Sequence, residues 1–156
     1  MFGKKPHQEN AAVYVDRKGE TAIVVSMHYN GAGGFLFEDD SPAVVAITGE
    51  PEDLGTVLLR ALRACEIRTK SSQRDRKLTD WPAFRCSGRN TVKKFESDFI
   101  HLHVHGTSEA NVTYVVEGWP AKDAELRAVA NASGHSPAQL GERCILVWRA
   151  CRDRVL

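Results

Sequence analysis

The chain has 156 residues, of which 42% are hydrophobic and 26% charged, with a formal net charge of +1 at pH 7. This composition is typical of a globular domain and excludes a disordered or membrane-embedded chain, and the length allows a core that needs no metal or disulfide. The first ten residues, MFGKKPHQEN, contain no apolar run of the kind found in a signal peptide. We therefore expect a cytoplasmic protein that forms a single domain over residues 1–156.

The first half of the chain is rich in β-forming residues. Runs at 11–17 and 21–29 flank the turn Lys18-Gly19-Glu20 and predict a β-hairpin. A short strand at 35–37 and a buried strand at 43–48 are expected next. The second of these leads directly into a helix.

That helix belongs to an internal sequence repeat, at 51–68 (PEDLGTVLLRALRACEIR) and 137–154 (PAQLGERCILVWRACRDR). With ordinary residue usage about one match in eighteen positions is expected by chance, yet seven are identical. These repeats indicate two related halves that each end in the same kind of helix. The identical pairs are Pro51/Pro137, Leu54/Leu140, Gly55/Gly141, Arg63/Arg149, Ala64/Ala150, Cys65/Cys151 and Arg68/Arg154.

Both repeats carry signals for the start of a helix. Pro51, like Pro137 after Ser136, suits the first helical position, and apolar residues recur at a period near 3.6. Glycine one turn into a helix is unfavourable by roughly 1 kcal/mol against alanine. Its recurrence as Gly55 and Gly141 predicts a close approach of another backbone.

Between the repeats we expect a basic connection at 67–82 and then a second set of strands. Asn90-Thr91 predicts the start of a short helix at 91–97. The runs 98–106 and 111–119 predict a hairpin around the turn 107–110. The alanine-rich run near 126–132 favours a helix by propensity, but the repeat places a strand there.

These elements predict an α+β fold. We expect a single domain of two pseudo-symmetric halves, 11–68 and 83–154, joined by the basic connection at 67–82. Each half consists of a hairpin, a further strand and a helix, so that a mostly antiparallel sheet carries two main helices.

The balanced net charge conceals two runs of opposite sign. Residues 31–59 contain no Lys or Arg, whereas residues 60–94 contain eleven against three acidic residues. Such an asymmetry suits a charged partner, although both runs could simply be solvated surface. The acidic residues are Glu38, Asp39, Asp40, Glu50, Glu52 and Asp53.

The strand expected at 98–106 holds three alternating histidines, His101, His103 and His105, which share one face. The pattern is close to that of histidine-triad nucleotide hydrolases, and histidines two apart on a strand can share zinc. Gly106 and the residues after it do not suit the hydrolases, and a zinc site would need further ligands such as His28 or His135. A strand with a histidine-rich polar face is the interpretation that we favour. We expect no metal and no cofactor.

Two tryptophans and four cysteines complete the candidates. Trp81 and Trp119 each precede a proline at the edge of a loop. They could either cover the hydrophobic core or anchor a contact with a partner. The basic run with Trp81 could bind a single nucleic-acid strand, but no known motif is visible. The cysteines show no Cys-x-x-Cys spacing, and three of them lie on apolar helix faces, so we expect buried, reduced thiols.

Several of these segments together resemble the immunity proteins of bacterial contact-dependent growth inhibition systems. They are the helix DLGTVLLRALRAC, the segment SGRNTVKKFESDFIHLHVH, the strand NVTYVVEGWP and the helix QLGERCILVWRAC, and the likeness covers roughly residues 50–152. Its elements are the two Leu-Gly helices and, before the strand pair, Gly88, Val92, Lys93 and Phe95. The histidine run is not part of that family's pattern.

The resemblance implies a cytoplasmic protein without enzymatic activity. Such a protein binds the C-terminal toxin domain of a contact-dependent effector, commonly a nuclease, and blocks it. It implies no membrane association, and we expect no direct contact with nucleic acid. Acidic residues suit a partner that binds phosphates through positive surface. The residues that we predict to bind the toxin are Glu38, Asp39, Asp40, Glu52, Asp53, Trp81 and Trp119.

Overall fold

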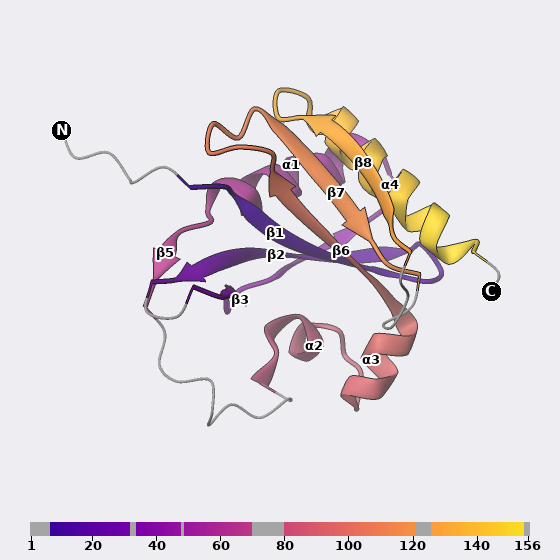
Figure 1. Cartoon of the computed structure of the whole chain (residues 1–156). Coiled ribbons are helices and arrows are strands. Elements are labelled where there is room, and N and C mark those ends of the chain that lie inside the picture. Colours follow the sequence, from indigo (N-terminus) through magenta and orange to yellow (C-terminus); the bar gives the residue numbers. More distant parts are fainter. Residues whose placement is uncertain (1–6, 32–33, 48, 70–79, 121–125, 155–156) are drawn as a thin grey trace.

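The computed structural model describes residues 7–31, 34–47, 49–69, 80–120 and 126–154. Within these residues one mixed sheet carries four helices, which confirms the predicted α+β class (Figure 1). In chain order the elements are β1 (Asn10–Asp16), β2 (Thr21–Asn30), β3 (Leu36–Glu38), β4 (Ala43–Ala46), α1 (Pro51–Arg63), β5 (Ile67–Arg68), α2 (Pro82–Cys86), α3 (Val92–Asp98), β6 (Phe99–Gly106), β7 (Thr113–Gly118), β8 (Ala128–Ser133) and α4 (Pro137–Arg152).

The pairing of the strands repeats along the chain. In the first set β1 pairs with β2 and β2 with β4, all antiparallel, before α1 follows. In the second set β6 pairs with β7 and β7 with β8 in the same manner, before α4 follows. The two sets meet where β1 and β6 pair antiparallel, with Val13 opposite Leu102. At the far end of β2, β3 pairs antiparallel and β5 parallel.

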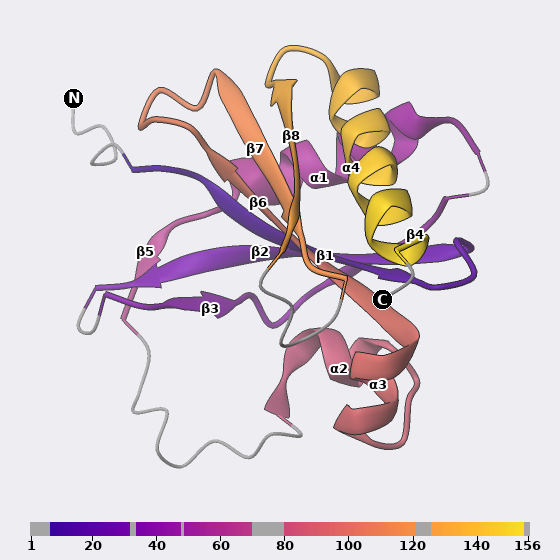
Figure 2. The same ribbon diagram turned by 45° about the vertical axis from the view of Figure 1, so that its right-hand side comes forward.

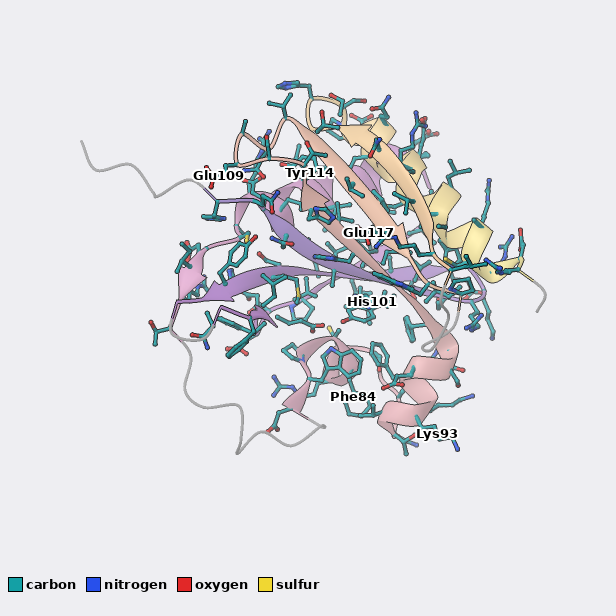
Figure 3. The ribbon with its side chains drawn as sticks, viewed as in Figure 1. Phe84, Lys93, His101, Glu109, Tyr114 and Glu117 are labelled. Atoms are coloured by element: carbon teal, nitrogen blue, oxygen red, sulfur yellow. The ribbon has the colours of Figure 1, made fainter. Side chains whose placement is uncertain are left out.

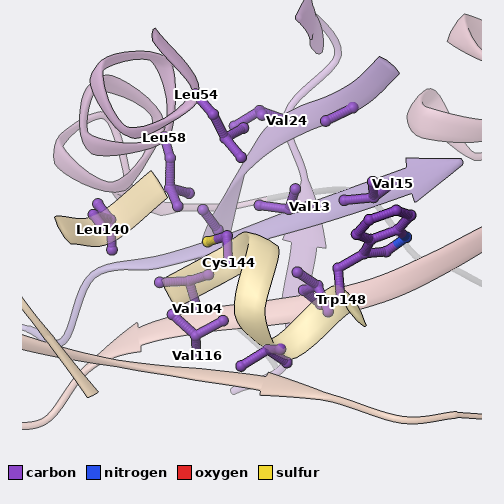
Figure 4. Close-up of a cluster of buried hydrophobic side chains, with 14 of the residues drawn as sticks. Val13, Val15, Val24, Leu54, Leu58, Val104, Val116, Leu140, Cys144 and Trp148 are labelled. Atoms are coloured by element: carbon purple, nitrogen blue, oxygen red, sulfur yellow. The ribbon is translucent and has the colours of Figure 1, made fainter. Parts of the chain in front are cut away.

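Helices α1 and α4 cover one face of this sheet. Alternate residues of the strands point toward the apolar stripes of both helices, as the periods of 2 and 3.6 require (Figure 4). This apolar core contains the strand residues Val13, Val24, Leu102, Val104 and Val116 and the helix residues Leu54, Leu58, Leu62, Leu140, Cys144, Val147 and Trp148.

The two repeated glycines lie where α1 and α4 cross. A Cβ atom on Gly55 would lie 1.7 Å from the carbonyl oxygen of Pro137, and one on Gly141 would lie 1.9 Å from the carbonyl oxygen of Pro51. Each helix therefore needs glycine at its fifth residue because the first turn of the other helix passes against it. The predicted close approach of a second backbone is confirmed at both positions.

Helices α2 and α3 lie on the opposite face, apart from α1 and α4 (Figure 2). Thr91 caps α3 as predicted, since its hydroxyl oxygen accepts a hydrogen bond from the Lys94 backbone N–H at 3.1 Å. The second apolar cluster joins these helices to β1, β2 and the start of β6, and it includes no described residue of β7 or β8. Its buried members are Ala12, Tyr14, Ile23, Val25, Ala83, Phe84, Phe95 and Phe99.

Three predicted elements differ from the structure. The strand expected at 43–48 as buried is a mainly exposed edge strand, with Val44 58% exposed, because β4 pairs with β2 alone. The first repeat helix, expected to include Ala64 and Cys65, ends at Arg63. The connection expected at 67–82 contains β5 at its start and reaches α2 at its end, while residues 70–79 lie outside the described residues.

The cysteines follow the prediction with one exception. Cys65, Cys144 and Cys151 are buried reduced cysteines, and Cys86 is exposed. Burial raises the pKa of Cys144 to about 12, so its thiol stays protonated and packs as a small apolar group.

Candidate functional site

Glu38 is a buried residue that ties the second helical layer to the sheet. Its carboxylate accepts hydrogen bonds from the Tyr14 hydroxyl, from Trp81 Nε1 at 2.7 Å and from the Ala83 backbone N–H at 3.0 Å. Burial and the neighbouring Glu38 raise the pKa of Tyr14 well above its usual value, so the phenol remains a donor. Glu38, which we predicted to bind the toxin together with its acidic neighbours, ends β3 and is only 8% exposed.

Asp39 points into a second small network. Its carboxylate accepts from His28 Nε2 at 2.7 Å and pairs with Arg68 at 3.1 Å. His28 is fully buried, and its Nδ1 accepts from the Glu66 backbone N–H, so the ring carries its proton on Nε2. Burial would raise the pKa of Asp39, but the hydrogen bonds from His28 and Ser41 and the charge of Arg68 lower it. Asp39 thus joins β5 to β2.

The other predicted acidic residues lie on the surface but do not form one patch. Asp40 is exposed beyond β3, whereas Glu52 and Asp53 are exposed in the first turn of α1. The backbone N–H of Asp39 donates to the Ser26 carbonyl oxygen, whereas that of Ile47, shortly before α1, donates to the Glu20 carbonyl oxygen. Ser26 and Glu20 are separated by roughly 20 Å along the direction of β2. The structure therefore does not bring the two acidic runs together. Their role in docking stays a prediction.

The three histidines of β6 share one face, as predicted, opposite the core residues Leu102 and Val104. His101, labelled in Figure 3, lies on the side of the sheet that carries α2 and α3. His103 Nε2 lies 2.9 Å from the Asn10 side-chain oxygen, and His105 Nε2 lies 2.9 Å from Glu117. Burial and the neighbouring His105 lower the pKa of His103 despite the charge of Glu117, which favours a neutral ring. Among the described residues no three His, Cys, Asp or Glu side chains form a group that could hold a metal ion.

A pocket of about 640 Å³ opens between this face of the sheet and helices α2 and α3. It brings together Trp81 and Trp119, which the sequence separates by 38 positions, and it also contains His101. Its lining is mainly aromatic and apolar, with Arg17 and Glu96 as charged members. The remaining lining residues are Tyr14, Phe95, Phe99, Ile100 and Pro120.

Ring contacts run continuously along the pocket. The His101 ring is stacked on Tyr14, with centroids 4.7 Å apart, and lies 6.3 Å from the Trp119 ring. Tyr14 in turn packs edge-on against Trp81 at 5.7 Å. Surrounding protein atoms, and then His103, lower the pKa of His101, although part of its side chain remains open to solvent. The pocket can therefore stack against a ligand and offer it a neutral hydrogen-bonding imidazole.

Trp81 and Trp119 were predicted from the sequence as binding residues, but the other pocket residues and the helix that places Trp81 were not. Tyr14 lies in a strand whose near-continuous apolar run indicates burial on both faces, but nothing in the sequence shows which residues cover it. Trp81 forms the N-cap of α2, a helix that was not predicted, and Pro82 at its first position was the one available signal.

Comparison with solved structures relates the fold to two others. A protein of unknown function from Neisseria meningitidis is similar with a TM-score of 0.70 and 17% sequence identity, over 97% of this chain and 99% of that chain. A chain of the CdiA-CT/CdiI toxin and immunity complex from Yersinia pseudotuberculosis is similar with a TM-score of 0.63 and 12% identity, over 95% and 98%. The chain shares the fold of these proteins.

Sequence comparison adds no further relative, because no protein-family model and no curated protein matches the chain. The helices in the described part of the chain are all too short or too polar to cross a membrane.

Proposed function

We propose that this protein is a cytoplasmic immunity protein that binds and neutralises the toxin domain of a contact-dependent growth inhibition effector, without enzymatic activity of its own. The observation that carries the proposal is the fold, which is similar over nearly the full length of both chains to a member of a toxin and immunity complex. The sequence segments that resemble immunity proteins support the same function independently. They include both repeat helices and the strand pair β6–β7.

The surface supports a binding role more than a catalytic one. His103 and His105 are held by Asn10 and Glu117, and Glu117 also pairs with Arg127. The Glu117 carboxylate beside these rings opposes the approach of a phosphate. The exposed acidic residues, in contrast, suit a basic nuclease, which needs positive surface to bind its own substrate.

The gene adjacent to the one that encodes this protein provides the test of the proposed function. An effector encoded immediately upstream supplies a C-terminal domain that should be toxic when expressed alone and harmless when expressed with this protein. Purification of both should give a one-to-one complex. Toxicity that co-expression does not relieve, together with no complex at micromolar concentration, would contradict the proposal.

Two further measurements distinguish the alternatives that the sequence left open. Metal analysis of the purified protein, together with a nucleotide-hydrolysis assay, tests the histidine strand, with the His101→Ala, His103→Ala, His105→Ala triple variant as the control. Titration with a fluorescent single-stranded oligonucleotide tests the basic run. The immunity function would be contradicted in favour of a metal site or a hydrolase if the protein held one equivalent of zinc or showed hydrolysis that the triple variant loses. Submicromolar oligonucleotide binding would favour a nucleic-acid-binding protein instead.

A further inference from the structure

The pocket between the sheet and α2–α3 has the composition of a site for an aromatic group. Four rings, those of Tyr14, Trp81, His101 and Trp119, follow one another along it. Its volume of about 640 Å³ exceeds that of any one side chain and lies within the range of pockets that bind small organic ligands. A planar group would find ring faces and edges for stacking there.

The polar groups of the pocket differ in how well they are satisfied. Trp81 Nε1 donates to Glu38, and Arg17 Nε donates to the Ser97 carbonyl oxygen at 2.7 Å. The ring nitrogens of His101 have no hydrogen-bond partner among the described residues. His101 is therefore the group in the pocket that a ligand can engage, through one donor and one acceptor of a neutral ring.

The charges of the pocket select an uncharged occupant. Arg17 and Glu96 line it with opposite signs, which leaves no net charge to attract an ion. The ring faces attract a cation, but the protein atoms that lower the pKa of His101 by desolvation would also remove the hydration of a cationic occupant, and this cost favours an uncharged one. An anion would meet the negative faces of the aromatic rings and the carboxylate of Glu96.

We propose that this pocket receives an uncharged aromatic side chain with a hydrogen-bonding group, tyrosine or tryptophan, from the toxin, which stacks between Trp119 and Trp81 and bonds to His101. This inference rests on the proposed function and specifies one contact within it. Buried aromatic anchors in pockets carry a large share of the binding energy at protein interfaces. The acidic residues would then set the rate of association, and the pocket the lifetime of the complex.

A small probe tests the pocket without the toxin. The probe is p-cresol, the tyrosine side chain as a free molecule, followed through the three indole N–H signals in nitrogen-15 spectra. We expect millimolar p-cresol to shift the signals of Trp81 and Trp119 in a saturable manner and to leave that of Trp148, which is buried in the other core, unchanged. Toluene, which lacks the hydroxyl, should bind several-fold more weakly.

Three results with probes would overturn the inference. They are no saturable shift with p-cresol, an equal shift of Trp148, or stronger binding of N-acetylarginine amide or of adenosine monophosphate than of p-cresol. The last two ligands would assign the pocket to a cation or to a nucleobase.

Variants of the pocket residues test the same contact in the complex with the toxin domain. Trp119→Ala and His101→Ala should each raise the Kd for the toxin domain about 30-fold, mainly through faster dissociation. Leu146→Ala, an exposed apolar residue on α4, is the matched control and should leave Kd unchanged. A complex whose Kd is unaffected by both pocket variants overturns this inference but keeps the proposed function, whereas the absence of any complex overturns both.

Discussion

The two faces of the sheet are built from different contacts. On one face α1 and α4 pack through aliphatic side chains and a reciprocal pair of glycines, and this core extends across both sets of strands. On the other face α2 and α3 cover β1, β2 and only the start of β6, through aromatic rings and the buried carboxylate of Glu38. The uncovered part carries the histidines and borders the pocket.

This difference separates stability from recognition. The repeated face is apolar and closed, so its contacts can contribute only to folding. The other face leaves polar and aromatic groups at the surface, where a partner can reach them. Substitutions on the two faces should therefore have different consequences.

The largest effect is expected at the helix crossing. Gly55→Ala would place a methyl group 1.7 Å from the Pro137 carbonyl oxygen, so the helices must move apart. We expect a loss of about 3 kcal/mol or more in the free energy of unfolding, measured in urea, although alanine is the better helix former. Thr56→Ala, at the neighbouring exposed position, should change it by less than about 0.5 kcal/mol. Equal stability of the two variants would show that the crossing is not tightly packed.

A smaller loss is expected on the second face from Glu38→Ala. The change leaves Tyr14, Trp81 and Ala83 without their acceptor. Unsatisfied buried donors cost about 1–3 kcal/mol each before relaxation, and we expect a net loss of about 2 kcal/mol with a changed near-ultraviolet circular dichroism of the aromatic cluster. Glu109→Ala, in an exposed loop, serves as the control. An unchanged aromatic spectrum would mean that α2 docks without this carboxylate.

The second face should also respond to acid through Asp16. Burial would raise the pKa of this carboxyl, but hydrogen bonds from Glu20 and Thr21 lower it. A depressed pKa in the folded state stabilises the protein above the unfolded value of about 4, and the contribution disappears as the pH falls through the folded pKa. In urea titrations the free energy of unfolding of the wild type should exceed that of Asp16→Asn by about 1 kcal/mol at pH 6. This difference should become smaller below about pH 4. A gap that is constant with pH would contradict the assignment.

An effect on stability no larger than that of Asp16→Asn is expected from reversing the exposed acidic residues. Lysine at Asp40, Glu52 and Asp53 should lower the association rate with the toxin domain about tenfold at low salt, and added salt should reduce the difference. The free energy of unfolding should fall by only about 1 kcal/mol, because two of the residues lie at the start of α1. Asp39 is left intact since it pairs with His28 and Arg68. An unchanged rate and salt dependence would place docking elsewhere.

The elements that could be predicted from the sequence are those whose signals are local. Ser136 and Pro137 define the start of α4 through a cap and a fixed dihedral, and both act within one turn. The strand β8 lies within an alanine-rich run that favours a helix by propensity, and only the repeat predicted a strand there. Internal repetition thus carried information that propensity did not.

The site was harder to predict because its residues meet through the fold. Glu38 belongs to an acidic run that suggests solvent, yet its environment is set by Trp81 and Ala83, more than forty residues away. The pocket similarly joins Tyr14 with Trp81 and Trp119. Burial of one carboxylate within a charged run depends on which helix covers the strand, and no local pattern encodes that.

The reciprocal contact of Gly55 and Gly141 has a consequence for how such a chain could arise. Each helix offers the other the same carbonyl that it receives, and β1 and β6 lie antiparallel side by side between them. Reciprocal contacts of this kind are related by a twofold rotation axis, and the interface of an isologous dimer has the same arrangement. Two copies of a chain of half the length would satisfy the same geometry. Fusing them end to end would remove the dependence of folding on protein concentration and would free α2 and α3, which only one segment carries, to specialise.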